Sequence, residues 1–353
     1  MKPQPARFPL MALGLLALLA ALWAGLVRLG WALPPLRPTL PVAHGPLMIS
    51  GFLGTVIALE RAVALRHRWT YVAPALTGLG ALALIAGLSA PAGPLLITLG
   101  SLGLVAVFGV IIRRQTALFT ITMGLGALTW LAGNLLWLAG WPISRVVLWW
   151  AGFLVLTIVG ERLELSRLLN PPRSVQTAFV AATGLFVAGL VVSLFDLDVG
   201  SRLAGLGMIA LALWLGRYDI ARRTVRKAGL TRFIAVCLLA GYVWLGIGGL
   251  LALGQGGTVA GPRYDAMLHA IFLGFVFSMI FGHAPVIFPG VLGVSVPFRQ
   301  SFYGHLVLLH ASLVLRMVGD LAGWLPGRQW GGLLNVVALL LFLANTVRAT
   351  RSA

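Results

Sequence analysis

The sequence is poor in charged residues, in acidic residues and in cysteine. Only 10% of its 353 residues are charged while 59% are hydrophobic, and eight Asp and Glu stand against 26 Lys and Arg. A chain with so few charges cannot cover an apolar core with polar side chains, which excludes a water-soluble domain. The single cysteine, Cys237, lies inside an apolar run, which excludes disulfides and cysteine-rich metal sites.

The long apolar runs do not alternate between apolar and polar residues, which excludes a transmembrane β-barrel. Runs of about 18 or more apolar residues recur along the whole chain instead, as expected for membrane-spanning helices. Twelve spans fit, at 8–30, 43–65, 71–90, 93–113, 117–140, 143–165, 174–195, 200–217, 230–254, 264–288, 301–321 and 330–348. The first resembles a signal peptide but is too long for one, so it is predicted to be a span. The sequence thus predicts an all-α polytopic membrane protein, one integral domain over residues 1–353.

The basic residues lie between the apolar runs, so the net charge of +18 indicates membrane topology rather than nucleic-acid binding. Nineteen Lys and Arg fall at the chain termini or in the loops after even-numbered spans, and seven fall on the opposite side. This bias predicts a protein of the inner membrane with the lipid bilayer as its partner and with both termini in the cytoplasm.

Three ten-residue segments resemble one another: GFLGTVIALE at Gly51–Glu60, GFLVLTIVGE at Gly152–Glu161 and GFVFSMIFGH at Gly274–His283. They begin 101 and 122 residues apart and fall on spans 2, 6 and 10. A repeat of this kind predicts one module used three times, with units of about 1–115, 116–217 and 218–353. We therefore expect three units of four helices in a pseudo-threefold bundle.

Two histidines are predicted near the outer ends of spans, His44 in AHGPLM on span 2 and His269 in DAMLHA on span 10. Two neutral imidazoles that face each other from different helices form the axial pair of a low-spin haem, and we predict that role here. A hydrogen bond between helices is the simpler alternative for either one. Asp265, one turn before His269, either caps span 10 or orients the imidazole.

A second group of histidines is predicted at the inner side: His283 on span 10, and His305 and His310 on span 11. His283 is fourteen residues beyond His269, about 21 Å along a helix, so the two cannot bind the same iron. The helix is expected to end at Pro285 and Pro289. His283, His305 and His310 are candidates for a second haem or metal site.

The pairs Glu60–Arg61 and Glu161–Arg162 allow two interpretations. Each arginine can anchor its helix at the lipid headgroups while the glutamate pairs with it. Alternatively, the glutamates form an inner polar cluster with His283, or with both His283 and His305, serving as a proton path or a second metal site.

Small residues accompany the repeats at Gly51, Gly54, Gly274 and Gly282. Small residues let helix backbones approach one another, so these four glycines are predicted to serve close helix packing rather than clearance for a macrocycle.

The segment AHGPLM resembles the AHGxxM segment of the heme-copper oxidase catalytic subunits, in which that histidine is an axial haem ligand. Those subunits also have twelve spans in three four-helix arcs, and their second ligand lies on span 10. The resemblance implies that His44 and His269 bind haem iron. The chain departs from that family elsewhere, since span 6 has no histidine, spans 7 and 8 have no histidine pair, and span 10 lacks His-x-His. No complete oxidase or nitric oxide reductase active site is visible, and no catalytic residue is named.

The chain is also similar to the NnrS family of membrane haem proteins in length, in twelve-span topology, in an early histidine on span 2 and in the late segment Leu268–His269. That resemblance implies a b-type haem and a role in nitric oxide metabolism, the nitrosative stress response or electron transfer. Nitric oxide, a quinol or another redox subunit would then be the partner. Two alternatives stay open: a transporter or channel lined by Glu60, Glu161 and His283, and a redox-silent assembly subunit whose histidines bridge helices.

Overall fold

The computed structural model describes residues 4–88, 91–169 and 171–351. Within these ranges the chain forms helices joined by short loops and contains no strand. In the described part of the chain, twelve helices are long and apolar enough to cross a membrane, and each coincides with one predicted span. The all-α polytopic architecture is therefore confirmed.

Contacts divide the chain into two compact units, Met1–Phe153 with Val286–Ser295, and Leu154–Pro285 with Val296–Ala353. Helix α7 (Ile143–Ser166) and helix α13 (Ser278–Leu292) contribute residues to both. The unit that holds the N-terminus is called unit 1 below, and the other is called unit 2.

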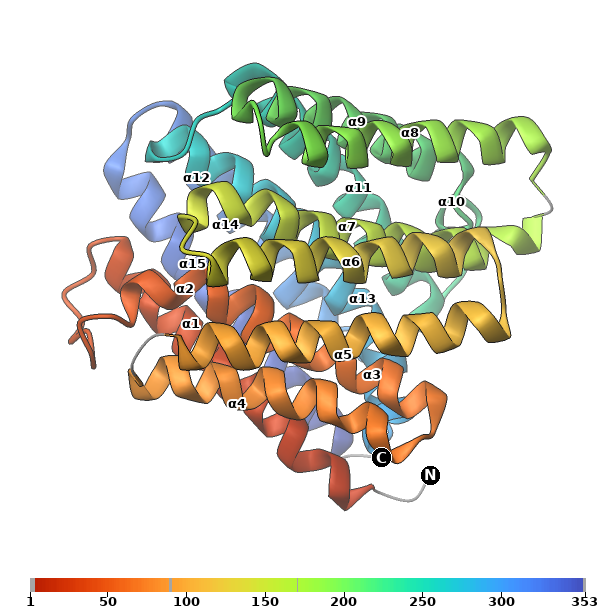
Figure 1. Ribbon diagram of the computed structural model, residues 1–353, viewed down its shortest axis with the longest axis horizontal. Coiled ribbons are helices and arrows are strands. Elements are labelled where there is room, and N and C mark those ends of the chain that lie inside the picture. The colour runs from red at the N-terminus through yellow and green to blue at the C-terminus, as the bar shows by residue number, and fades with distance from the viewer. Residues whose placement is uncertain (1–3, 89–90, 170, 352–353) are drawn as a thin grey trace. The chain divides into compact units, whose positions relative to one another are not determined.

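Unit 1 contains the first five candidate spans. Its helices are η1 (Pro5–Arg7), α1 (Phe8–Arg28), η2 (Pro41–Ala43), α2 (His44–Pro46), the π-helical η3 (Leu47–Gly54), α3 (Thr55–Leu65), η4 (Arg68–Tyr71), α4 (Val72–Ala86), α5 (Ala92–Arg114) and α6 (Leu118–Leu138). Figure 1 shows α4 beside α5 and α5 beside α6, as their short connections require. The π-helix η3 packs against α1 and α4, so span 2 lies in the interior of unit 1.

A buried polar network ties span 2 to its neighbours in unit 1. The indole of Trp130 donates to Ser50 Oγ (3.0 Å), and the indole of Trp150 donates to Asn134 Oδ1 (2.9 Å). Trp130 also stacks on Phe153 with ring centroids 4.6 Å apart. Burying a polar group without a hydrogen-bond partner costs free energy, so these hydrogen bonds favour one packing arrangement of spans 2, 5 and 6 within unit 1.

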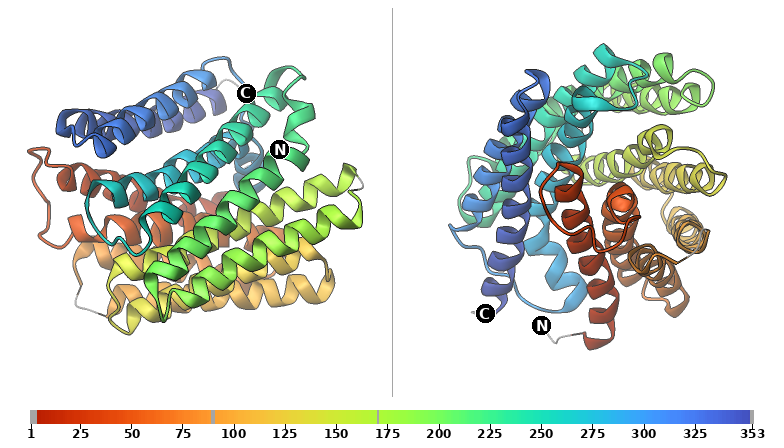
Figure 2. Two further views of the ribbon diagram at one scale, coloured as in Figure 1. Left: turned by 90° about the horizontal axis from the view of Figure 1, so that it is seen from above. Right: turned by 90° about the vertical axis from the view of Figure 1, so that its left-hand side faces the viewer.

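Unit 2 contains the later spans. Its helices are η5 (Arg167–Leu169), α8 (Arg173–Val192), α9 (Leu197–Tyr218), α10 (Ala221–Thr224), α11 (Gly229–Gln255), α12 (Gly261–His269), the π-helical η6 (Ala270–Phe277), α14 (Phe302–Leu321) and α15 (Leu325–Thr350). Helix α9 packs against both α8 and α11, and α14 packs along α15, the pair drawn in blue in Figure 2.

The four glycines singled out in the repeats serve close packing, as predicted. A Cβ at Gly54 would run into the Trp130 ring, and a Cβ at Gly274 into the Trp244 ring. At Gly51 the nearest atoms are the methyl carbons of Ala81 and Ala17, and at Gly282 the nearest is Cys237 Cβ. The three repeat copies differ in backbone, because Gly51 and Gly274 lie in π-helices whereas Gly152 lies in the α-helix α7.

The expectation that the helix of span 10 ends at Pro285 and Pro289 is wrong. Helix α13 continues through both prolines to Leu292, so Gly261–Leu292 forms one candidate span of 32 residues. Each proline removes only one backbone hydrogen bond, and the two lie four residues apart, on one face. Membrane helices tolerate such gaps where neighbouring groups satisfy the freed carbonyls.

Candidate functional site

His44 lies in unit 1 at the start of α2, immediately before the π-helix η3. Its Nδ1 is 2.7 Å from the carbonyl oxygen of Ala21 on α1. A carbonyl only accepts, so Nδ1 carries the proton and Nε2 carries the lone pair in the neutral ring. Gly25 makes room for the imidazole, since a Cβ there would come within 2.9 Å of His44 Cε1. The ring is thus oriented by α1, in the tautomer that can bind a metal through Nε2.

His269 in unit 2 has the same tautomer. It ends α12 and precedes the π-helix η6, and its Nδ1 lies 2.8 Å from the carbonyl oxygen of Asp265. The Asp265 carboxylate is also close, with Oδ1 3.4 Å from Nδ1. The N-cap of α12 is Ala260, so Asp265 does not cap the helix. The capping role is thus excluded, and the role of the carboxylate in orienting the imidazole stays a prediction.

Asp265 belongs to an ionic cluster within unit 2, formed with Arg316, Arg328 and Asp320. Arg316 on α14 donates to both carboxylate oxygens of Asp265, at 2.9 and 3.0 Å. Arg328 on α15 lies 3.0 Å from Asp320 and 3.8 Å from Asp265. The bidentate bond to Arg316 holds the carboxylate, and the carboxylate in turn stands against His269.

His283 repeats this local pattern, with its Nδ1 2.8 Å from the carbonyl oxygen of Met279. The carbonyl acceptor again places the proton on Nδ1 and the lone pair on Nε2.

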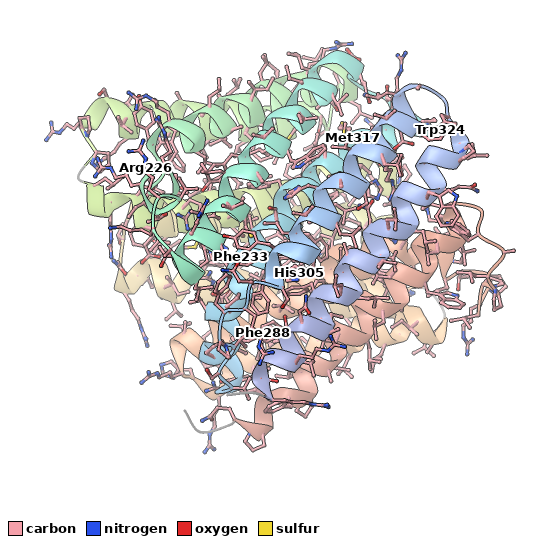
Figure 3. The ribbon with its side chains drawn as sticks, turned by 180° about the vertical axis from the view of Figure 1, so that it is seen from behind. Arg226, Phe233, Phe288, His305, Met317 and Trp324 are labelled. Atoms are coloured by element: carbon pink, nitrogen blue, oxygen red, sulfur yellow. The ribbon has the colours of Figure 1, made fainter. Side chains whose placement is uncertain are left out.

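His305 has the opposite tautomer. The Asn345 amide nitrogen lies 3.1 Å from His305 Nδ1 and also donates to the carbonyl oxygen of Ser301 (3.3 Å), which fixes the amide orientation. Nδ1 therefore accepts, and Nε2 carries the proton. Phe281 stands edge-to-face against the ring at 4.7 Å, and Figure 3 shows Phe233 beside it. His305 connects α14 to α15 inside an aromatic cluster.

His310 also accepts at Nδ1, from the indole of Trp244 (2.9 Å). Its Nε2–H faces Ser278 Oγ at 3.4 Å, and Ser278 donates to the Cys237 carbonyl (2.7 Å). His310 thus joins α14 to α11 and α13. Among the described residues, no three His, Cys, Asp or Glu side chains are grouped to hold a metal ion. The second haem or metal site stays a prediction.

The two Glu–Arg pairs differ. Glu60 and Arg61 form an ion pair in unit 1 (3.5 Å), and their anchoring at the lipid headgroups stays a prediction. Arg162 is not a headgroup anchor: its side chain is 3% exposed and donates to both oxygens of Asp219, each at 2.9 Å. A buried guanidinium is destabilising unless a hydrogen-bonded carboxylate compensates its charge. Asp219, at the end of α9, is that carboxylate for Arg162. Glu161 is half-buried on the same helix.

The sequence analysis did not identify Asp219, Arg316, Asp320 or Arg328 as interacting residues. One signal was present, because Asp219 is the single acidic residue of the basic segment 217–232. The pairing of Arg316, Asp320 and Arg328 depends on how α12, α14 and α15 pack.

No curated protein matches this chain. Residues 7–351 match the family described as Domain of unknown function (DUF8744), and this match covers all twelve candidate spans apart from the first two residues of the first span. The chain therefore belongs to the DUF8744 family.

Proposed function

We propose that this membrane protein binds a b-type haem through His44 and His269. The observation that carries the proposal is the shared state of the two imidazoles. Each donates from Nδ1 to a backbone carbonyl and keeps the lone pair on Nε2, which is the arrangement that metal-binding histidines adopt. That the two residues bind the same iron is a prediction from the sequence. The tautomer of each ring follows from a hydrogen bond within its own unit.

The residues around the two imidazoles hold each ring in a fixed orientation, as expected for a histidine that binds a metal. Gly25 leaves space beside the His44 ring, and Asp265 sets a carboxylate against His269 Nδ1. A carboxylate at this position raises the basicity of the ligand nitrogen. His269 leads directly into the π-helix η6, and His44 begins the short helix α2 that precedes the π-helix η3; π-helices occur frequently at functional sites.

Haem would supply reversible one-electron chemistry. We propose a role in nitric oxide handling or electron transfer, with a quinol or another redox subunit as electron donor. The support for nitric oxide is the resemblance to the NnrS family. No turnover site is assigned.

The test is a reduced-minus-oxidised absorption spectrum of the purified chain, with a pyridine haemochromogen assay. We expect about one haem per chain with low-spin bands, and we expect His44→Ala and His269→Ala each to remove those bands. His67→Ala is the control, because His67 is exposed and accepts from Arg114 (2.9 Å). His283→Ala should also keep the bands, although its tautomer is the same, because it lies too far along span 10 to bind the same iron.

A redox-silent assembly subunit is the second candidate. The observation that favours it is that His305 and His310 bridge helices through ordinary hydrogen bonds. A colourless protein purified from haem-replete cells would support this candidate and contradict haem binding.

A further inference from the structure

Unit 1 contains an open pocket of about 530 Å³ where α1 begins and α3 ends. Arg7, Arg66, Arg68 and Tyr71 line it, and Val63 contributes to its apolar wall. None of its lining residues is acidic. The pocket therefore gathers three positive charges and a phenolic hydroxyl around a space large enough for a small anionic group.

The backbone holds Arg66 at this pocket in an unusual way. Arg66 follows α3 with φ +58°, in the left-handed region, and its N–H bonds the carbonyl of Ala62 (3.1 Å) to close the helix. Glycine is the usual residue at such a position, and a non-glycine residue there costs free energy. Arg66 therefore lines the pocket from a backbone position that glycine would occupy at lower cost.

Arg7 is also held in place. Its guanidinium donates to the carbonyl of Val291 (2.9 Å) and the residue is half-buried. Across the described part of the chain, Arg7, Arg66 and Arg68 form no ion pair with a carboxylate. Three such guanidiniums at one pocket repel one another unless an anion binds among them.

The position of the pocket indicates which anion is available. The candidate spans Pro5–Arg28, Pro41–Leu65 and Arg68–Ala86 each have an end at this pocket. Trp69, beside Arg68, is 45% exposed, and exposed tryptophans at span ends mark the headgroup level of a membrane. Below the pocket, Val63 and Tyr71 pack against a buried apolar cluster that includes Met11 and Leu59. At the headgroup level the phosphate groups of lipids are the anions that lie nearest to such a pocket.

We propose that this pocket binds the phosphate group of an anionic phospholipid. Guanidinium groups bind phosphate oxygens in bidentate fashion, and basic pockets at the ends of membrane helices recognise anionic headgroups. The zwitterionic headgroup of phosphatidylcholine brings its own cation next to the arginines, so it binds less well.

The test is a titration of the purified full chain in detergent with phosphatidylglycerol, followed by native mass spectrometry. We expect phosphatidylglycerol to bind more tightly than phosphatidylcholine, and Arg66→Gln or Arg68→Gln each to weaken it about fivefold. The matched control is Arg113→Gln, an exposed arginine near the end of α5 that loses the same charge outside the pocket. Equal weakening by Arg113→Gln would mean general surface attraction and would overturn the proposal.

Two further experiments are needed. One distinguishes a loss of lipid binding from a loss of folding, and the other distinguishes a lipid phosphate from a soluble phosphate as the ligand. Arg66→Gly relieves the left-handed strain, so it should retain or raise the unfolding temperature while it weakens phosphatidylglycerol binding about fivefold. Unchanged binding in this variant would overturn the proposal. Millimolar inorganic phosphate or glycerol phosphate should leave the lipid bound, and displacement by either would show a site for soluble phosphates instead of lipid.

Discussion

At the residue scale, the charged side chains of this protein form both buried and exposed ion pairs. Loss of a buried pair should reduce the stability of the protein more than loss of an exposed pair. Arg162 and Asp219 are almost fully buried, and each satisfies the other through two hydrogen bonds. Glu164 and Arg167 are 3.9 Å apart, and both are more than a third exposed. Removing one partner of a buried pair leaves an uncompensated charge, whereas an exposed pair is screened by water.

We therefore expect Arg162→Met to lower the free energy of unfolding by about 3–5 kcal/mol. Glu164→Gln, in the same helix, should change it by no more than about 1 kcal/mol. Thermal or denaturant unfolding in detergent measures both. The double variant Arg162→Met with Asp219→Leu should recover part of the loss, because no unpaired charge remains. Equal stability of the wild type and Arg162→Met would show that the pair is not buried.

Asp265 carries a second prediction at this scale. Asp265→Asn removes a negative charge beside His269 but keeps the backbone carbonyl that orients the ring. If haem is bound, it should be retained with a higher midpoint potential, since the ligand becomes a weaker electron donor. A redox titration measures the change, and Glu60→Gln, far along span 2 from His44, is the control. An unchanged midpoint potential in Asp265→Asn would show that this carboxylate does not influence the haem.

At the element scale, most of the fold follows from patterns within single helices. The twelve spans were predictable because each is a local apolar run, and the packing role of the four repeat glycines followed from their size. The continuation of α13 through Pro285 and Pro289 was not predictable, since a proline inside a helical pattern usually marks the end or a kink of the helix. The tautomers of the histidines and the Arg162–Asp219 pair likewise depend on contacts between residues distant in sequence.

The glycines of the π-helical repeats give the prediction at this scale. Gly54→Ala and Gly274→Ala should each destabilise the protein by about 1–3 kcal/mol, because the added methyl meets a tryptophan ring in a tightly packed interior. Gly109→Ala on α5 is the matched control, since nothing lies within 4 Å of its Cβ position. That variant should be neutral or stabilising by about 1 kcal/mol. Identical effects at all three positions would contradict the packing argument.

At the scale of the whole molecule, an even number of spans places both ends of the chain on one side of the membrane. The distribution of Lys and Arg predicts that this side is the cytoplasm. A green fluorescent protein fused to either terminus should therefore fluoresce, whereas alkaline phosphatase at the same positions should be inactive. An active phosphatase fusion at one terminus alone would require an odd number of spans.

The haem proposal also belongs to this scale, since its two histidines lie on spans 2 and 10 of the sequence. The measurement that tests it most directly is the dithionite-reduced minus oxidised spectrum of the purified protein, with haem quantified per chain. Sharp low-spin bands at about one haem per chain, lost in both His44→Ala and His269→Ala, are the predicted result. A colourless wild-type protein, or bands that survive both substitutions, would contradict it.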